Sequence, residues 1–319
     1  MIQSTINHVF IVGVPRSGTT LVRDLISRHP QVAMPQDEFQ LIPFLIKRFG
    51  HKAELDATDI NRYLSILKRS SFYHHRKGDT PLRDWRPTSS TLPKIITETL
   101  WYFAPGGTSS NLRFIGDKTP NNLLHLEPIL ERFPESKFIH VVRDPRDVAV
   151  SSRKAWKKSL IRAAHQWQRG VTAADDFSQK YPNNILTVRY EDLLADSRAE
   201  LSSVCNFLDL PFDESLLELT GSRETMGDAA GYPGVKTDNA GKFEATLSEQ
   251  KLELFTSYIH KEMAAYGYEC EKPTNTRYFG QLELAILSLY DLLGSTLRHI
   301  KNKGLISGIR YRVVQILLR

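Results

Sequence analysis

Short apolar runs alternate with longer segments of helical periodicity along most of the chain. The clearest runs cover residues 8–12, 138–142 and 185–188, and each is followed by a segment whose apolar residues recur every three or four positions. Weaker runs lie at 32–34 and 113–115. Strands that alternate with helices are typical of βαβ units. The pattern therefore predicts an α/β fold with a P-loop-type central parallel β-sheet flanked by helices.

Residues 50 to about 112 interrupt this alternation of predicted strands and helices. They are rich in polar and aromatic residues, contain Pro81, Pro87 and Pro93, and end in a stretch of Gly, Thr and Ser at 106–110. We expect a mostly helical insertion that caps the α/β domain. It forms either a surface excursion or a wall of a substrate pocket, since loops on α/β sheets carry specificity.

The composition is that of a folded, globular protein. Of 319 residues, 41% are hydrophobic and 24% are charged, which excludes disordered and low-complexity classes and suits one α/β domain with insertions. Cys205 and Cys270 cannot form a disulfide framework and lack the spacing of a metal site. The chain has no run of about 18 apolar residues and no charged leader before its first strand. We therefore expect a cytoplasmic protein with no metal, signal peptide or membrane-spanning helix.

The net charge of +6 is concentrated at the C-terminus. Residues 297–319 contain six basic residues and no acid, so the preceding chain is formally neutral, and we expect no nucleic-acid partner. Gly304 and Gly308 divide this basic segment. We predict a domain over 1–278 and a basic tail of two short amphipathic helices over 279–319. The tail either packs against the body or a second subunit, as in a homodimer, or lies on an anionic membrane surface.

A glycine-containing turn follows the first predicted strand and precedes a helical segment. The spacing of Gly13, Gly18 and Thr20 is that of a P-loop, whose backbone N–H groups and helix N-terminus hold an anion. A nucleoside triphosphatase has Lys where this chain has Thr19, and Arg16 lies inside the loop instead. Because an arginine can bind phosphate or sulfate through two N–H groups, the loop suits a nucleotide 5′-phosphosulfate better than ATP.

A second anion-binding element follows the predicted strand at 138–142. Arg143 ends this strand, and Asp144 and Pro145 are typical of a helix N-terminus. Ser151 lies two turns into the predicted helix. Arg143 and Ser151 can therefore converge on one oxyanion, although an arginine at a strand end also fits a solvated cap.

Together the two elements resemble the sulfotransferase family that uses 3′-phosphoadenosine 5′-phosphosulfate (PAPS), over about residues 6–270. In that family a P-R-S-G-T-T-L type loop binds the 5′-phosphosulfate, and an Arg and a Ser eight residues apart bind the 3′-phosphate. The likeness is greatest to the branch of tyrosylprotein sulfotransferases and their bacterial relatives. The resemblance implies that PAPS is bound by Arg143, Ser151, Pro15, Arg16, Ser17, Gly18, Thr19, Thr20 and Leu21.

Three further segments are similar to motifs of this family. A Gly-Asp-Lys-Thr-Pro segment implies that Lys118 contacts the transferring sulfuryl group. An Arg-Tyr-Glu-Asp-Leu segment implies that Tyr190 borders the nucleotide, and packing of Tyr190 in the core stays open as the alternative. The segment 237–243 resembles the loop that closes over the cofactor, where the resemblance points to Lys242.

Sulfuryl transfer to a hydroxyl group also requires a base that removes the acceptor proton. In the tyrosylprotein branch this base is a Glu shortly after a His-Pro pair, and here Asp37 and Glu38 occupy that place. Counting forward from the His-Pro pair selects Asp37, whereas counting back from the following Ile-Pro pair selects Glu38. We prefer Glu38. His140 is a weaker candidate because it lies within an apolar strand.

We therefore predict a PAPS-dependent sulfotransferase in which Glu38 deprotonates a hydroxyl acceptor while Lys118 and Arg16 stabilise charge at the transferring group. A kinase-like phosphotransferase is the alternative of the same class, and the Thr at the P-loop lysine position argues against it. A non-catalytic protein that binds nucleotides or anions is the alternative from another class. A peptide tyrosine, a carbohydrate, a lipid and a small phenol all suit such a site, so the acceptor stays open.

Overall fold

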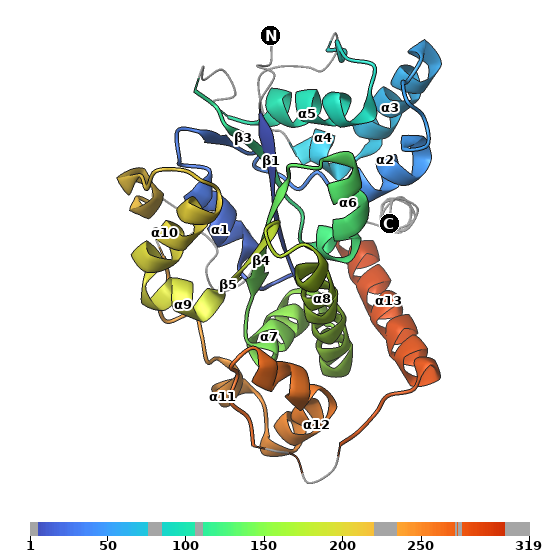
Figure 1. Ribbon diagram of the computed structural model, residues 1–319. Coiled ribbons are helices and arrows are strands. Elements are labelled where there is room, and N and C mark those ends of the chain that lie inside the picture. The colour runs from blue at the N-terminus through green and yellow to red at the C-terminus, as the bar shows by residue number, and fades with distance from the viewer. Residues whose placement is uncertain are drawn as a thin grey trace.

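A five-stranded parallel sheet forms the centre of the computed structural model, which describes residues 6–75, 85–105, 111–219, 235–271, 273 and 276–303 (Figure 1). The strand order is β2-β3-β1-β4-β5, and every neighbouring pair is parallel. The strands are β1 Asn7–Gly13, β2 Val32–Ala33, β3 Phe114–Lys118, β4 Lys137–Val142 and β5 Ile185–Arg189. The predicted α/β fold and all five predicted strands are confirmed.

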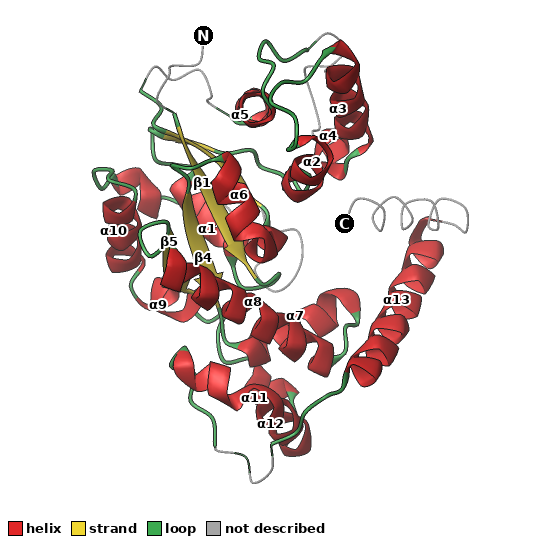
Figure 2. Ribbon diagram, turned by 45° about the vertical axis from the view of Figure 1, so that its right-hand side comes forward, coloured by secondary structure: helices red, strands yellow, loops and turns green. Residues whose placement is uncertain are grey.

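Helices connect the strands and extend the fold beyond them (Figure 2). The α-helices are α1 Thr19–Ile26, α2 Ile42–Phe49, α3 Ala57–Arg69, α4 Ser71–His75, α5 Leu92–Phe103, α6 Leu126–Arg132, α7 Pro145–Trp156, α8 Leu160–Lys180, α9 Tyr190–Ala195, α10 Ser197–Phe207, α11 Phe243–Thr246, α12 Glu249–Ala265 and α13 Gln281–Lys303. Two 3₁₀ helices are η1 Pro120–His125 and η2 Glu214–Leu217.

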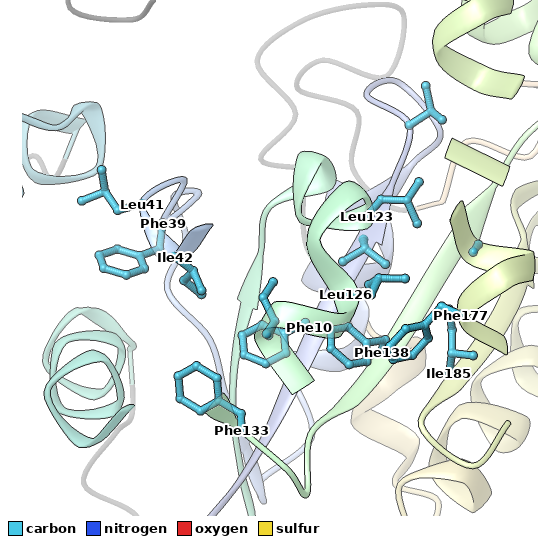
Figure 3. Close-up of a cluster of buried hydrophobic side chains, with 14 of the residues drawn as sticks. Phe10, Phe39, Leu41, Ile42, Leu123, Leu126, Phe133, Phe138, Phe177 and Ile185 are labelled. Carbon is cyan, nitrogen blue, oxygen red and sulfur yellow. The ribbon is translucent and has the colours of Figure 1, made fainter. Parts of the chain in front are cut away.

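Side chains alternate between the two faces of the sheet, and each face is covered by helices. Phe10 of β1 packs with Phe138 and Phe177 in a cluster shared with α6 and α8, where the ring centroids of Phe10 and Phe138 are 5.5 Å apart (Figure 3). Val9 and Ile11 instead belong to a second cluster with α1, α9 and α10, which lie on the opposite side of the sheet (Figure 1). Burial on both faces explains why the strands are continuous apolar runs.

The carboxyl ends of the strands meet at one edge of the sheet because all strands are parallel. Ile11 of β1 is paired with Lys118 at the end of β3, and Gly13 at the end of β1 is paired with Val141 of β4. β4 is paired in turn with β5. This edge therefore brings together four features at the ends of adjacent strands: the predicted P-loop, Lys118, Arg143 and the start of α9.

The insertion shares its core with the sheet. Helices α3, α4 and α5 account for most of the described residues between 57 and 103, in agreement with the predicted helical character. Leu64, Phe72 and Ile95 from these helices are buried in the same cluster as Phe10. The packing therefore places the insertion against β3, which ends in Lys118, and against Phe39, the residue after Glu38.

The C-terminal helix α13 is 23 residues long, longer than the short helix predicted there. It is held against α8 by Asp291, whose carboxylate accepts hydrogen bonds from the backbone N–H of Ser159 at 3.0 Å and from Arg162 at 3.1 Å. The second predicted helix, from Gly304 onward, lies outside the described residues. Among the helices described here, none combines the length and the apolar character needed to cross a bilayer.

Candidate active site

Two residues in the left-handed region shape the loop between β1 and α1. Arg16 has φ of 83° and Gly18 has φ of 94°. A residue other than glycine adopts this conformation at a cost in conformational free energy, and such residues concentrate at ligand-binding turns. A Cβ atom at position 18 would lie 2.3 Å from the ring of Tyr190, so only glycine fits between that ring and the start of α1.

The loop presents unsatisfied polar groups at the N-terminus of α1. Ser17 is fully buried, and its Oγ has no hydrogen-bond partner among the residues that the structure describes. Thr19 is also buried as the first residue of α1, whereas Pro15, Thr20 and Leu21 are half-buried. An unpaired buried hydroxyl beside the free N–H groups of a helix N-terminus is the donor set that an anion requires.

The second predicted element contacts the first. Asp144 caps α7 by accepting a hydrogen bond from the backbone N–H of Arg146 at 2.8 Å, so only two residues separate the start of the helix from the end of β4. Ser151 then lies close enough to the loop for Arg16 Nε to donate to its Oγ at 3.1 Å. The structure thus joins two residues that are 135 positions apart in the sequence.

Arg143 lies over the ring of Tyr190, with 4.5 Å between its guanidinium carbon and the ring centroid. One guanidinium nitrogen donates to Asp147 at 3.1 Å and to the carbonyl oxygen of Asn239 at 2.5 Å, while the buried Nε has no partner among the described residues. Tyr190 is 3% exposed, and burial raises the pKa of its hydroxyl, which accepts a hydrogen bond from Asn239. Tyr190 therefore packs in the interior and also lies against Arg143 and Gly18.

Asp147 organises the loop that carries Lys242. Its buried carboxylate accepts hydrogen bonds from the backbone N–H groups of Gly241 at 2.9 Å and Phe243 at 3.0 Å, in addition to the bond from Arg143. Lys242, half-buried, lies between these two anchored residues. The sequence prediction did not include Asp147 or Asn239. For Asp147, the one indication in the sequence is its spacing of four residues from Arg143, which is typical of an ion pair.

Glu38 and Lys118 form an ion pair at the end of β3. Lys118 Nζ donates to Glu38 Oε1 at 2.6 Å, and the second carboxylate oxygen of Glu38 accepts from Gln40 at 2.7 Å. The side chain of Lys118 is 6% exposed, whereas that of Glu38 is 31% exposed and so remains accessible from solvent. Asp37 is also partly exposed. Of the two carboxylates that the sequence left open, Glu38 is thus the one that contacts Lys118.

His140 is unsuited to act as a base. It is fully buried in β4, and burial lowers the pKa of its imidazole to about 4. Its Nδ1 lies 3.3 Å from the hydroxyl of Thr187 on the neighbouring strand, which indicates a role in the packing of the sheet. Within the described ranges, no group of three or more His, Cys, Asp or Glu side chains is placed to hold a metal ion.

Comparison with known proteins assigns the family. A sequence model of the Sulfotransferase family matches residues 8–214. The chain is similar to a putative protein-tyrosine sulfotransferase of Caenorhabditis briggsae, with 24% identity over 69% of this chain and 72% of the relative. It is also similar to protein-tyrosine sulfotransferase 1 of Danio rerio, with 25% identity over 73% of this chain and 60% of the relative. The chain belongs to the sulfotransferase family.

The fold agrees with this assignment. The sulfotransferase domain of the Synechococcus PCC 7002 olefin synthase superposes with a TM-score of 0.58 and 23% identity, over 85% of this chain and 98% of that domain. This likeness confirms the predicted fold. The family match confirms the predicted family and its reaction class of sulfuryl transfer. The roles of the individual site residues stay predictions.

Proposed function

We propose that this protein transfers the sulfuryl group of PAPS to a hydroxyl acceptor at the carboxyl edge of the sheet. The observation that carries the proposal is the hydrogen bond between Arg16 and Ser151, because it joins the two anion-binding elements into one site. PAPS carries an anionic group at each end of its ribose, and two linked anion sites match this charge distribution. The Glu38–Lys118 pair supplies a carboxylate and a cation at the same edge.

The residues of the site fit this donor. The unpaired Ser17 hydroxyl and the N-terminus of α1 suit the 5′-phosphosulfate, together with Arg16. Arg143, with its unpaired Nε, and Ser151 suit the 3′-phosphate, and Tyr190 and Lys242 belong to the segments around Arg143. When bound, PAPS supplies an activated sulfuryl group with a 5′-phosphate as its leaving group.

The remaining chemistry belongs to side chains of this protein. Glu38 accepts the proton of the acceptor hydroxyl at a carboxylate oxygen, which makes the oxygen of the acceptor a stronger nucleophile. Lys118 orients that carboxylate and places a positive charge beside it, and Arg16 adds a second cation. Thr19 at the P-loop lysine position argues against a kinase-like phosphotransferase, and the base and cations argue against a purely binding role. A tyrosine hydroxyl is the first acceptor to test, since the names of both curated relatives reported above refer to protein-tyrosine sulfotransferases.

Nucleotide-dependent thermal unfolding tests the donor specificity. The desulfated donor, 3′-phosphoadenosine 5′-phosphate (PAP), should stabilise the protein by about 2.7 kcal/mol at a concentration of about 100 times its Kd. AMP, which differs only by the missing 3′-phosphate, should shift the melting temperature much less at the same concentration. Stronger stabilisation by ATP than by PAP would instead support the phosphotransferase alternative.

For the tail, we propose contact with an anionic membrane surface on the cytoplasmic side. Four apolar side chains on one face of α13 are exposed: Leu282, Ile286, Leu289 and Tyr290. Six basic residues lie in the segment 297–319. Exposed apolar residues combined with basic charge favour binding to anionic lipids.

Co-sedimentation of the full chain with phosphatidylserine-containing vesicles tests the membrane proposal. The wild type should sediment with these vesicles in a salt-sensitive way, and the double variant Ile286→Glu, Leu289→Glu should remain in the supernatant. Neutral vesicles serve as the control. A stable homodimer that binds neither kind of vesicle would contradict the proposal. The exposed apolar face of α13 would then be assigned to contact with a second subunit.

A further inference from the structure

A buried carboxylate with no part in the proposed chemistry lies directly behind the Glu38–Lys118 pair. Asp117 precedes Lys118 in β3 and is 0% exposed. Its Oδ1 accepts a hydrogen bond from the backbone N–H of Phe39 at 2.9 Å, and its Oδ2 accepts one from the side chain of Asn122 at 3.2 Å. A buried charge is costly unless such donors compensate for the lost hydration. A carboxylate at this buried position is therefore expected to serve a purpose through the hydrogen bonds that it accepts.

The bond from Phe39 acts on the position of Glu38. The N–H of Phe39 belongs to the peptide unit whose carbonyl is that of Glu38, so fixing its direction also fixes the backbone from which the Glu38 side chain projects. The ring of Phe39 is buried against Phe72, with 5.0 Å between the centroids, so the residue that donates this bond is also held by its side chain.

A second buried residue fixes the other end of this segment. Arg23 of α1 donates to the carbonyl oxygen of Gln36 and is itself held by Asp24, with Nε–Oδ1 at 2.9 Å. Glu38 thus lies between one anchor on the helix that follows the P-loop and one anchor on the strand that carries Lys118. The segment 36–39 has no regular secondary structure, so these side chains replace the rigidity that a helix or strand would supply.

We infer that Asp117 is a positioning residue for the reaction: it accepts the Phe39 N–H and so holds the carboxylate of Glu38 in register with Lys118 and the P-loop. The inference rests on the proposed function, since it assigns a role relative to the proposed base. Asp117 contacts neither the donor nor the acceptor in this account. Its carboxylate acts only through the backbone at Phe39 and through its place beside Lys118 in β3.

The ionisation of Asp117 is consistent with this role. Burial raises the pKa of its carboxyl group to about 6, and the charge of Glu38 also raises it, while the Phe39 N–H and Lys118 lower it. Both of its oxygens accept hydrogen bonds from N–H donors, the arrangement that an ionised carboxylate favours.

Two measurements on the full chain distinguish a positioning role of Asp117 from a general effect on protein stability. They are the steady-state rate of sulfuryl transfer and the Kd of PAP, determined by calorimetry. Asp117→Ala removes the acceptor of the Phe39 N–H and should lower kcat about 10²-fold, with the Kd of PAP within about twofold of the wild-type value. Asp117→Asn retains an acceptor oxygen and should restore kcat to within about fivefold of wild type. Asn122→Ala removes only the other partner of Asp117 and is the matched control, with kcat also near wild type.

The variant Asp117→Glu keeps the test decisive if the alanine variant does not fold. This substitution preserves the charge and displaces the acceptor oxygens by one methylene. If Asp117 positions Glu38, kcat should fall by about 10-fold or more while PAP binding is retained. Equal activity of Asp117→Glu and wild type overturns the inference, as does a loss in Asp117→Asn as large as that in Asp117→Ala. A wild type that binds PAP but transfers no sulfuryl group overturns the proposed function as well, whereas an active wild type with unaffected Asp117 variants overturns only the positioning role.

Discussion

Replacement of Glu38 by Gln should lower the turnover of sulfuryl transfer by about 10² to 10⁴-fold and leave PAP binding unchanged. The amide keeps the size of the side chain, and its oxygen can still accept the hydrogen bond that Lys118 donates at 2.6 Å. It cannot take up the proton of the acceptor hydroxyl at neutral pH. The change therefore removes proton transfer while it preserves the geometry of the site. Initial rates at saturating donor, with PAP affinity measured in parallel, check the prediction.

Asp37→Asn is the matched control because it applies the same isosteric change to the adjacent residue. The ion pair to Lys118 is made by Glu38, so the Asp37 variant should lose far less activity. A reversal of the two effects would move the base to Asp37. Small and equal effects in both variants would favour a histidine base or proton transfer to the substrate itself.

Loss of either proposed contact to the 3′-phosphate should reduce the discrimination between PAP and AMP. In the proposed complex Arg143 and Ser151 each donate a charge-assisted hydrogen bond, and loss of one such bond costs about 1.5 to 3 kcal/mol, or roughly 10- to 150-fold in affinity. Arg143→Ala and Ser151→Ala should therefore weaken PAP by this amount and leave AMP nearly unaffected. Calorimetric titration of each variant with both nucleotides measures the effect.

The serine variant is the cleaner of the two. Arg143 also bonds to Asp147 and to the Asn239 carbonyl oxygen, so its removal loosens the loop that carries Lys242. Ser151 is bonded to the Arg16 side chain, and its neighbour Ser152, buried on the same helix, provides a control substitution to alanine. If Ser151→Ala discriminates between PAP and AMP as well as Ser152→Ala does, Ser151 does not contact the 3′-phosphate.

Features set by local sequence were the ones that could be predicted. The strands are continuous apolar runs because the sheet is buried on both faces, and the cap of α7 follows from the Asp144-Pro145 pair. The loop at Gly13–Gly18 was recognisable because its spacing and residue types are dictated by backbone geometry. These signals lie within a few residues of one another, so no knowledge of the tertiary packing was needed.

Contacts between distant segments could not be predicted in this way. The Arg16–Ser151 bond and the anchoring of the Lys242 loop by Asp147 depend on how α7 packs beside the P-loop, which no short pattern encodes. The choice between Asp37 and Glu38 depended on a one-residue offset, and register of that kind is decided by tertiary contacts such as the Asp117–Phe39 bond. Asp117 itself resembles any polar residue at a strand end until its burial is known.

Transfer of labelled sulfur from PAPS is the most direct test of the central claim. The wild-type protein, incubated with ³⁵S-labelled PAPS and a panel of hydroxyl acceptors that includes a tyrosine peptide, should place the label covalently on an acceptor oxygen and release one PAP for each sulfated product. Glu38→Gln should bind PAPS and transfer almost none of the label. Failure to label any acceptor in the panel, together with transfer of the γ-phosphate of ATP by the same protein, would contradict sulfuryl transfer as its activity.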